Sequence, residues 1–407
     1  MDIAIIGAGA AGMAAAITAA ASGTNRVLLL ERQSRVGKKL LATGNGRCNL
    51  SNWNAGPSHY HGADGEFVRH ALEAFPVQST LDFFQTLGLY TVTEPGGRIY
   101  PYSDQANSVV DVLRFALDRK NLELKLGCEV TGVKKVGDGF LIRTSEEQLH
   151  ADRLIVACGG AAGTKLGGGL SGYQLLRSLG HHCTKLSPSL VQVKTETDLV
   201  RSLKGVRANA SIRYERRESL LAQAEGEVQF TEYGVSGPAV FDLSRTISTI
   251  PDGLLRMNLL PFMQEEELLS SLCIRISRYP SMTCEDLLTG ILHNRLGRVV
   301  VRACEIPLSQ ALTSLNWKQL TKVVETCRDF RLQVQGTMGM DQAQVTAGGI
   351  VTKEFDPTTM ESRIVPGLYA AGEVLDVDGD CGGYNLQWAW SSGRLAGALK
   401  TANTTRR

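Results

Sequence analysis

The sequence has no excess of charge of either sign. Its 407 residues include 43 lysines and arginines against 41 aspartates and glutamates, which leaves a formal net charge of +2. Nucleic acids and anionic membranes are bound by clustered basic side chains, and the chain has no basic stripe of that kind. The group formed by Arg213, Arg216 and Arg217 is typical of a solvated face. We therefore predict no nucleic-acid partner and no membrane partner, while the oligomeric state stays open.

The nine cysteines lack the spacings of disulfide frameworks and zinc sites. They are scattered, odd in number and include no Cys-x-x-Cys pair, which is typical of reduced thiols in a cytoplasmic protein. His181 and His182 are adjacent, and adjacent residues on one strand point to opposite faces. Asp376, Asp378 and Asp380 are spaced like calcium ligands, but the closing glutamate and flanking helices of an EF-hand are missing. The sequence therefore predicts no metal site.

Long hydrophobic runs are also scarce. Residues 3–21 are nearly all apolar and numerous enough to span a bilayer. Three glycines in this run, Asp2 in place of a basic leader and the strand that follows argue against a membrane span or a signal peptide. No later stretch is long and apolar enough, and internal repeats are missing. The length predicts two or three domains.

The first thirty residues have the pattern of a dinucleotide-binding unit. A short apolar strand leads into the turn at residues 7–12, an alanine-rich helix follows, and a second strand ends in Glu31. Gly7 lets the chain turn, Gly9 lets the backbone approach a pyrophosphate, and Gly12 lets helix and strand pack closely. The helix start, with Ala10 and Ala11, offers free N–H groups to phosphates. Glu31 lies about twenty residues beyond the turn, where an acid accepts ribose hydroxyls.

Two further glycine-rich segments follow. Residues 37–52 combine two lysines, an arginine and several glycines, which favours a phosphate-binding loop over a plain surface turn. Residues 167–172 match Gly-x-Gly-x-x-Gly again. A second dinucleotide site needs its first glycine directly after a strand and an acid after the next strand, and neither condition is met. We predict that this segment opens a helix over residues 173–179 near the cofactor.

Two of these motifs carry a resemblance to a known family. GKKLLATGNGRCNLSN at residues 37–52 and GLYAAGEVLDVDGDCGGYNLQWAWSSG at residues 367–393 strongly resemble the BaiN/YhiN-type family of FAD-dependent oxidoreductases. The resemblance covers essentially the whole chain. It implies non-covalent FAD, not NAD, in the N-terminal site. It also implies reduction of conjugated double bonds in steroid-like enones, although an amine-oxidase activity is also attributed to the family.

The resemblance assigns roles to further residues. Val130 is expected to contact the adenine and Glu373 a ribityl hydroxyl, while Arg47, Cys48 and Tyr384 are candidates near the isoalloxazine. Gly383 and Asn385 are expected to open and cap a helix whose start stabilises negative charge on the reduced flavin. The predicted cofactor-binding residues are Gly7, Gly9, Ala10, Ala11, Gly12, Glu31, Arg32, Lys39, Thr43, Gly44, Asn45, Arg47, Cys48, Asn49, Val130, Ala157, Gly159, Gly372, Glu373, Asp376, Gly383, Tyr384, Asn385 and Leu386.

The order of patterns along the chain predicts the architecture. Helical spacing of apolar residues predicts helices over residues 67–87 and 106–117. Short strands at close intervals follow residue 187, helical patterns occupy residues 264–329, and residues 330–334 alternate like a strand. We predict an α/β fold with a discontinuous Rossmann-like FAD-binding domain at residues 1–186 and 346–407. A β-rich, barrel-like domain at residues 187–262 and 330–345 is inserted in it and carries a small helical insert at residues 263–329.

The predicted function is that of an FAD-dependent oxidoreductase. Reduced pyridine nucleotide, NAD(P)H, is expected to bind transiently, and the acceptor is expected to be a small molecule with an activated C=C bond. Two alternatives stay open: a flavin amine oxidase that uses oxygen, and a non-catalytic flavin-dependent RNA- or protein-binding factor. Cys48 is a redox thiol or a packed loop cysteine, and the second interpretation is favoured because no other cysteine lies nearby in sequence. The sequence identifies no catalytic acid and no substrate.

Overall fold

Five parallel strands form one sheet, which combines four strands from the first 156 residues with a fifth at residues 368–370. Their order is β20-β11-β1-β2-β7, and each neighbouring pair runs parallel. The strands are β1 (Asp2–Ile6), β2 (Arg26–Glu31), β7 (Leu122–Leu126), β11 (Arg153–Val156) and β20 (Leu368–Ala370). Parallel strands covered on both faces are continuously apolar, as Ile3 to Ile6 of β1 are.

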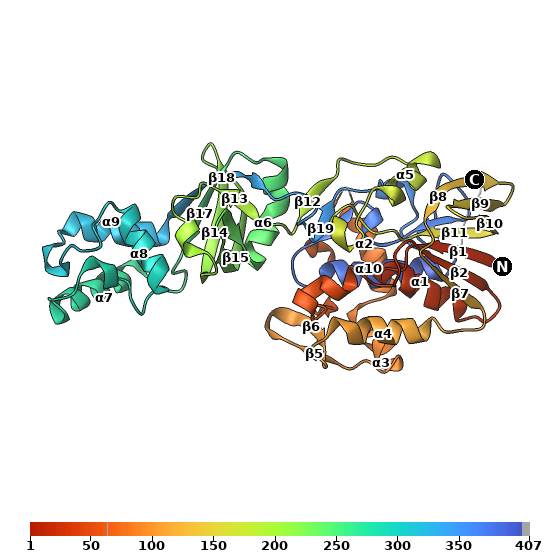
Figure 1. Ribbon diagram of the computed structural model, residues 1–407, viewed down its shortest axis with the longest axis horizontal. Helices are drawn as coiled ribbons and strands as arrows, with labels where there is room; N and C mark the ends of the chain where they lie inside the picture. The colour runs from red at the N-terminus through yellow and green to blue at the C-terminus, as the bar shows by residue number, and fades with distance from the viewer. Residues whose placement is uncertain (63, 401–407) are drawn as a thin grey trace. The chain divides into compact units, whose positions relative to one another are not determined.

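The computed structural model describes residues 1–62 and 64–400 (Figure 1). These residues divide into two units. The first unit contains Met1–Ser187 and the chain from Gln344 onward, and the second contains Pro188–Ala343. The chain leaves the first unit at β12 (Ser187–Ser189) and returns to it at β19 (Val345–Ala347). Within the described residues, no helix is both long and apolar enough to cross a membrane.

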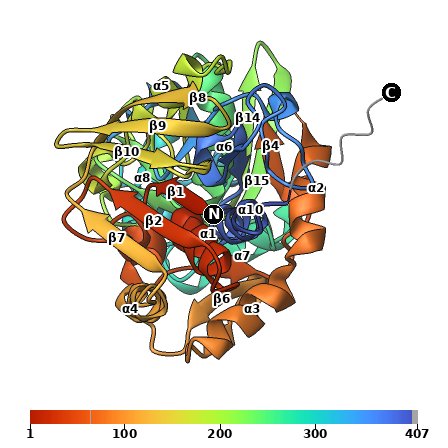
Figure 2. The same cartoon turned by 90° about the vertical axis from the view of Figure 1, so that its right-hand side faces the viewer.

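Helices α1 (Ala10–Ala20) and α10 (Tyr384–Gly397) pack closely against each other beside the parallel sheet (Figure 2). The approach depends on glycine. A Cβ atom at Gly393 would overlap the carbonyl oxygen of Ala11, and one at Gly397 would overlap that of Ala15. The first and last α-helices of the described residues are therefore in contact at the backbone level, although hundreds of residues separate them.

Smaller elements surround this core in the first unit. A three-stranded sheet contains β8 (Val130–Val136), β9 (Gly139–Thr144) and β10 (Gln148–Ala151). Another contains β3 (Ser51–Asn52), β5 (Thr91–Thr93) and β6 (Arg98–Pro101), and a two-stranded ribbon pairs β4 (Tyr60–Gly62) with β21 (Val377–Gly379). The remaining α-helices described in this unit are α2 (Gly65–Ala74), α3 (Val77–Thr86), α4 (Ala106–Ala116) and α5 (Ser171–Ser178).

One predicted helix is broken in two. The sequence pattern predicts a single helix over residues 67–87, but α2 ends at Ala74 and α3 begins at Val77 with Pro76 at its N-cap. Proline has no N–H group to donate within a helix and disfavours helical geometry in the residue before it. The apolar spacing continues across the break, which is why the pattern alone suggests one helix.

The second unit is built around a closed barrel of six antiparallel strands. Its strands are β13 (Val193–Thr195), β14 (Arg207–Arg216), β15 (Ser219–Phe230), β16 (Gly234–Ser236), β17 (Leu254–Asn258) and β18 (Phe330–Thr337). Buried and exposed residues alternate along β18, where Phe330, Leu332 and Val334 point inward. Helix α6 (Pro238–Thr249) packs on the barrel.

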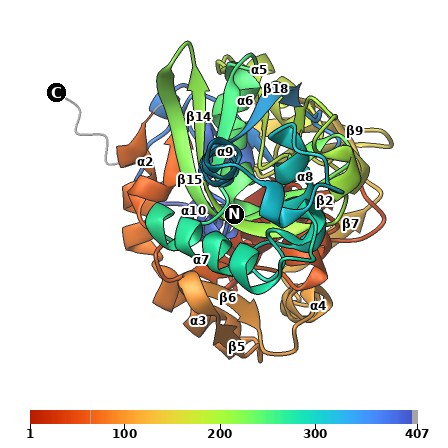
Figure 3. The same cartoon turned by 90° about the vertical axis from the view of Figure 1, so that its left-hand side faces the viewer.

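Three helices of the second unit lie together beside the barrel (Figures 1 and 3): α7 (Glu265–Arg278), α8 (Asn294–Ala303) and α9 (Trp317–Arg328). Their apolar residues join those of the barrel in one hydrophobic core. The predicted α/β class, with a Rossmann-type sheet and a barrel-like part, is confirmed.

Candidate functional site

Many of the predicted cofactor-binding residues gather at one edge of the parallel sheet. The glycine turn follows β1, Arg32 follows β2, Ala157 and Gly159 follow β11, and Glu373 follows β20. Each of these segments leaves the carboxyl end of its strand. Since parallel strands place their carboxyl ends at the same edge, the fold brings these segments together.

The three glycines of the turn have different steric roles. Gly7 has φ +102°, and a Cβ atom there would lie 2.5 Å from the carbonyl oxygen of Ala157. A Cβ atom at Gly12 would overlap the carbonyl oxygen of Gly7. At Gly9, which is the N-cap of α1, a Cβ atom would meet nothing within 4 Å, and no side chain caps the helix. Gly7 and Gly12 shape the turn, while Gly9 borders open space in front of uncapped N–H groups.

Glu31 lies beside this turn. One of its carboxylate oxygens accepts a hydrogen bond from the backbone N–H of Ala8 at 2.7 Å, and the other accepts from that of Gln33 at 2.8 Å. The acid that ends β2 is thus held next to the start of α1. This arrangement of uncapped helix, glycine turn and acid fits a dinucleotide that carries pyrophosphate and ribose.

The structure joins two predicted residues that lie far apart in sequence. The Nζ atom of Lys39 is 2.8 Å from Oε2 of Glu373, and Oε1 of Glu373 accepts from the backbone N–H of Thr346 at 2.8 Å. The Lys39 side chain is 30% exposed and that of Glu373 is 19% exposed, so solvent or a ligand can reach the pair. A cation and an anion therefore lie together at the carboxyl edge of the parallel sheet.

The loop at residues 43–49 is held in a strained backbone conformation. Asn45 and Cys48 have φ values of +57° and +63°, which non-glycine residues rarely adopt. The backbone N–H of Cys48 donates to the carbonyl oxygen of Thr43 at 2.9 Å and closes the loop. Burial raises the pKa of the Cys48 thiol to about 12, so the thiol stays protonated. This favours the packed cysteine over the redox thiol.

Arg47 is engaged by other residues of the same unit. Its guanidinium pairs with Glu94 and Asp104 and lies over the ring of Tyr100, 4.1 Å from the centroid. The hydrogen bonds that Arg47 donates to Glu94 and Asp104 raise its pKa above the ordinary value. Two carboxylates thus fix the orientation of the Arg47 guanidinium.

The start of α10 differs from the predicted arrangement in one respect. Asn385 does not cap the helix; its amide accepts from the N–H of Gly379 and donates to the carbonyl oxygen of the same residue, each at 2.8 Å. The N-cap is Gly383, with φ +100° and no side-chain cap. A Cβ atom at Gly383 would overlap the carbonyl oxygen of Ser51. The uncapped N–H groups of α10 therefore follow a glycine that the packing requires.

The second glycine segment lies beside the first site. Arg32 donates to the carbonyl oxygen of Gly167, and a Cβ atom at Gly169 would lie 3.0 Å from the same guanidinium. Helix α5 begins at Ser171, two residues before the predicted start. The segment therefore contacts Arg32, which follows β2, and it opens a helix as its sequence predicts.

The structure corrects the argument about the paired histidines. His181 and His182 do not lie on a strand, and both rings contact one carboxylate: the Nδ1 atoms lie 2.9 and 2.6 Å from Glu354. The N–H groups of Ile364 and Val365 both donate to Oγ of Ser362, so this hydroxyl donates its proton to Nε2 of His181. His181 is therefore a neutral ring. Among the described residues, no three His, Cys, Asp or Glu side chains are grouped as metal ligands.

The buried His181 ring predicts acid sensitivity of the first unit. Burial lowers its pKa, and the hydrogen bond to Glu354 opposes that effect only in part. The unfolded chain takes up a proton below about pH 6.5, where the native ring stays neutral. The free energy of unfolding is therefore expected to fall as the pH drops below that value, by at most about 1.4 kcal/mol per pH unit.

Urea titrations between pH 5 and pH 8 measure this effect. His181→Gln is expected to flatten the pH dependence in that range, while the exposed His150→Gln serves as the matched control. An unchanged pH dependence in the His181 variant would contradict the assignment.

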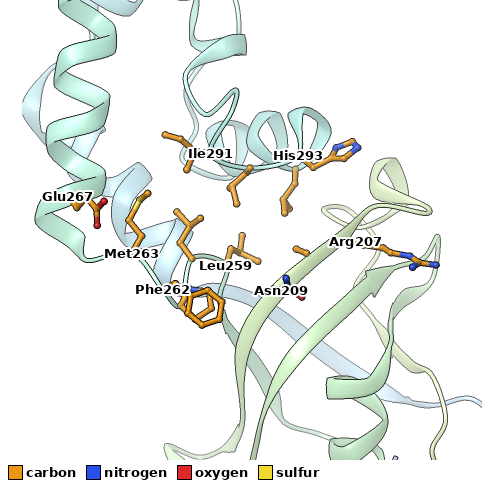
Figure 4. Close-up of a pocket in the computed structure, with 13 residues that line it drawn as sticks. Arg207, Asn209, Leu259, Phe262, Met263, Glu267, Ile291 and His293 are labelled. Carbon is orange, nitrogen blue, oxygen red and sulfur yellow. The ribbon is translucent and has the colours of Figure 1, made fainter. Parts of the chain in front are cut away.

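The second unit contains a separate cavity of about 410 Å³ between the barrel and the helices. Figure 4 shows Leu259, Met263 and Ile291 directed into this space, with Arg207 extending away from it. Its lining residues are Arg207, Ala208, Asn209, Leu259, Leu260, Pro261, Phe262, Met263, Glu267, Ile291, Leu292, His293 and Leu296. Sequence reasoning did not find this cavity, because its lining has no motif.

Comparison with known proteins identifies the family. Residues 1–399 match the model described as the HI0933-like protein Rossmann domain. The chain belongs to this HI0933-like family. It is 42% identical over 400 residues to the 3-dehydro-bile acid delta(4,6)-reductase of Clostridium scindens, covering 97% of this chain and 98% of the relative. It is 33% identical over 398 residues to the ribosomal RNA dihydrouridine synthase of Escherichia coli, covering 96% of each.

A solved structure shares the fold of this HI0933-like chain. The 3-ketosteroid delta1-dehydrogenase of Sterolibacterium denitrificans superposes with a TM-score of 0.52 at 12% identity, covering 98% of each chain. The predicted family resemblance is confirmed, and so is the prediction that the chain is an enzyme of an oxidoreductase family. The roles of individual site residues stay predictions.

Sequence reasoning on this HI0933-like chain missed two histidines near the start of α10. His59 and His61 both contact Asp380, which was considered only as a calcium ligand. No strand pattern joins the two rings, because His59 ends a 3-10 helix at residues 57–59 and His61 lies in β4. What the sequence did not reveal was the carboxylate that they share.

Proposed function

We propose that this protein is an FAD-dependent reductase that takes its electrons from NAD(P)H and reduces an activated C=C bond of a small molecule. The observation that carries the proposal is the convergence of the glycine turn, Glu31, the Lys39–Glu373 pair and the uncapped start of α10 in one unit. Near full-length similarity to a reductase supports the same reaction class.

The residues of the chain have distinct parts in this proposal. The start of α1 binds the pyrophosphate, and Glu31 accepts hydrogen bonds from the adenosine ribose. Glu373 accepts a hydrogen bond from a hydroxyl of the ribityl group, which links phosphate to flavin. Lys39 attracts the negative charge of the neighbouring phosphate. The N–H groups at the start of α10 favour negative charge on the pyrimidine side of the flavin. Bound FAD supplies hydride transfer, which no amino-acid side chain provides.

The proposal is tested on the purified yellow protein. Acid precipitation followed by chromatography is expected to release FAD. Anaerobic stopped-flow absorbance is then expected to show flavin reduction by NADH or NADPH and reoxidation by enones such as 2-cyclohexenone or a 4-ene-3-ketosteroid. Release of FMN alone, or reduction by amines but by neither nicotinamide, would refute it and favour the amine oxidase.

A second acceptor is favoured by a specific observation. Two relatives, at 33% and 30% identity over at least 95% of this chain, are ribosomal RNA dihydrouridine synthases. The ring C=C bond of uridine is also an activated double bond, so the same site chemistry serves either acceptor. The net charge of +2 argues for the small molecule. Adding ribosomal RNA to the reduced protein separates the two: faster reoxidation by RNA than by enones would establish the nucleic-acid substrate.

Glu31 gives a direct prediction about the cofactor. Glu31→Ala is expected to weaken FAD binding by about ten- to a hundredfold, because charge-assisted hydrogen bonds contribute about 1.5–3 kcal/mol. Titration of the apoprotein with FAD, followed by flavin fluorescence, measures the Kd. Glu129→Ala removes an exposed glutamate and is expected to leave the Kd unchanged. Equal Kd values for the Glu31 variant and the wild type would mean that the carboxylate only ties the turn to β2.

A further inference from the structure

Two histidines of the first unit share one carboxylate. The Nδ1 atom of His59 lies 2.9 Å from one oxygen of Asp380, and Nε2 of His61 lies 2.6 Å from the other. The side chains of His59, His61 and Asp380 are 35%, 40% and 27% exposed. The group is therefore ordered by its own hydrogen bonds and still accessible to a ligand.

The fold builds this group from segments more than 300 residues apart. Strands β4 and β21 pair antiparallel, with His61 opposite Asp378 and Tyr60 opposite Gly379. A Cβ atom at Gly62 would overlap the carbonyl oxygen of Asp376, so the ribbon is closely packed. Beyond the paired residues, the backbone N–H of Asp380 donates to the carbonyl oxygen of His59 at 3.0 Å. Backbone pairing thus fixes the carboxylate opposite the two rings.

The same group is attached to the start of α10. The ring of His59 stacks on that of Tyr384, with centroids 4.4 Å apart and an interplanar angle of 15°. Tyr384 is the first residue of α10, and the Tyr60 hydroxyl donates to its carbonyl oxygen at 2.9 Å. His59 therefore lies in van der Waals contact with the helix start to which the flavin is assigned under the proposed function.

Asp380 keeps its charge in this setting. Burial alone would raise its pKa, but the hydrogen bonds from His61 and His59 outweigh burial and lower it. An ionised carboxylate on Nδ1 orients the imidazole, in the way that an acid orients a catalytic histidine. The opposite ring nitrogen, Nε2 of His59, is then the donor of an acidic proton.

We propose that His59, oriented by Asp380, is the general acid that protonates the acceptor. This inference rests on the proposed function. Saturation of an activated C=C bond adds a hydride to the β carbon and a proton to the α carbon, so one two-electron donor and one acid balance the reaction. The hydride comes from the NAD(P)H-reduced cofactor. Nε2 of His59 gives the proton, the ring becomes neutral while Nδ1–H stays bonded to Asp380, and solvent returns the proton.

Other charged and titratable groups face this site from the neighbouring segments. The His61 ring binds the second oxygen of Asp380, and the buried Asp376 and Asp378 belong to the segment around β21. Cys381 follows Asp380, and the position of a Cβ atom at Gly382 lies 3.7 Å from Nε of Arg98. The phenol of Tyr60 is kept protonated because burial, and then the nearby charges of Tyr384 and Asp380, raise its pKa.

Single substitutions in the FAD-loaded protein separate the two half-reactions. His59→Gln is expected to be reduced by NADPH at the wild-type rate and reoxidised by 2-cyclohexenone about 10²- to 10⁴-fold more slowly, the range typical of a lost general acid. The wild-type reoxidation rate is expected to fall as the pH rises through the imidazole pKa, and the variant is expected to lack this dependence. His70→Gln, on the exposed face of α2, is the matched control.

A second measurement does not depend on turnover. In protein labelled with ¹⁵N-histidine, the His59 signals are expected to shift when bound FAD is reduced with dithionite, and Asp380→Asn is expected to shift them too because it replaces the carboxylate that accepts from Nδ1. The His70 signals are expected to respond to neither change.

The outcomes distinguish this inference from the proposed function. Failure of the wild type to accept electrons from NADH or NADPH would overturn the proposed function. The dithionite experiment would still show whether His59 lies near the flavin. His59 signals that do not change when the flavin is reduced would overturn the assignment of His59. A His59→Gln variant that is reoxidised at the wild-type rate with the wild-type pH dependence would overturn it as well.

Discussion

Gly12→Ala is expected to abolish FAD binding and to destabilise the first unit by about 3 kcal/mol, the upper range for overpacking in a rigid site. The added Cβ atom would overlap the carbonyl oxygen of Gly7 and would lie 3.5 Å from Cβ of Ala157. Backbone atoms of a turn between β1 and α1 cannot move aside as a flexible side chain can. The variant must therefore displace the helix start that is proposed to bind the pyrophosphate.

Urea denaturation and FAD titration of the same preparation measure both effects. Gly9→Ala is the matched control, since a Cβ atom there would meet nothing within 4 Å. It is expected to keep the wild-type unfolding midpoint while it loses FAD affinity, because the methyl group would occupy the approach of the pyrophosphate. A Gly12→Ala protein with the wild-type midpoint and Kd would show that the turn can accommodate the added methyl group, which would contradict the prediction.

Gly383→Val is expected to weaken FAD binding at least a hundredfold and to lower the midpoint potential of any flavin that still binds. The residue has φ +100°, a conformation that costs an ordinary residue about 1–2 kcal/mol. Its Cβ atom would also overlap the carbonyl oxygen of Ser51. The steric conflict is thus with the protein backbone behind the helix start, and it is expected to move the N–H groups of α10 away from the flavin charge that they are proposed to stabilise.

Spectroelectrochemical titration of the wild type and the variant measures this prediction. Gly96→Val is the control: Gly96 also has a positive φ, +80°, but a Cβ atom there would meet nothing within 4 Å. Its potential and FAD affinity are expected to match those of the wild type. If the Gly383 variant matches them too, the start of α10 does not contact the flavin, and the assignment of the C-terminal motif fails.

The two glycine predictions and the His59 inference address different steps. Gly12 concerns the binding of the cofactor, Gly383 its electron affinity, and His59 the protonation of the acceptor. Each therefore has its own readout: a Kd, a midpoint potential and a reoxidation rate. A variant that changes only one of the three supports the separate roles that the geometry suggests.

The sequence by itself determined the dinucleotide-binding unit and the family. The turn at residues 7–12, the helix after it and Glu31 all lie within about thirty residues, a separation over which steric limits and apolar spacing act locally. The barrel was also predictable, because short strands at close intervals have few other solutions. The break at Pro76 could have been predicted as well, since proline acts on its own helix.

Only the tertiary structure decided which side chains meet across the sequence. Lys39 contacts Glu373, His181 and His182 share Glu354, and Asn385 binds Gly379 instead of capping its helix. His59 finds its carboxylate 321 positions away. Such contacts depend on which strand lies beside which, here β4 beside β21, and on glycines that let backbones touch. Periodicity carries no information about that choice, because a strand has the same pattern whatever partner it pairs with.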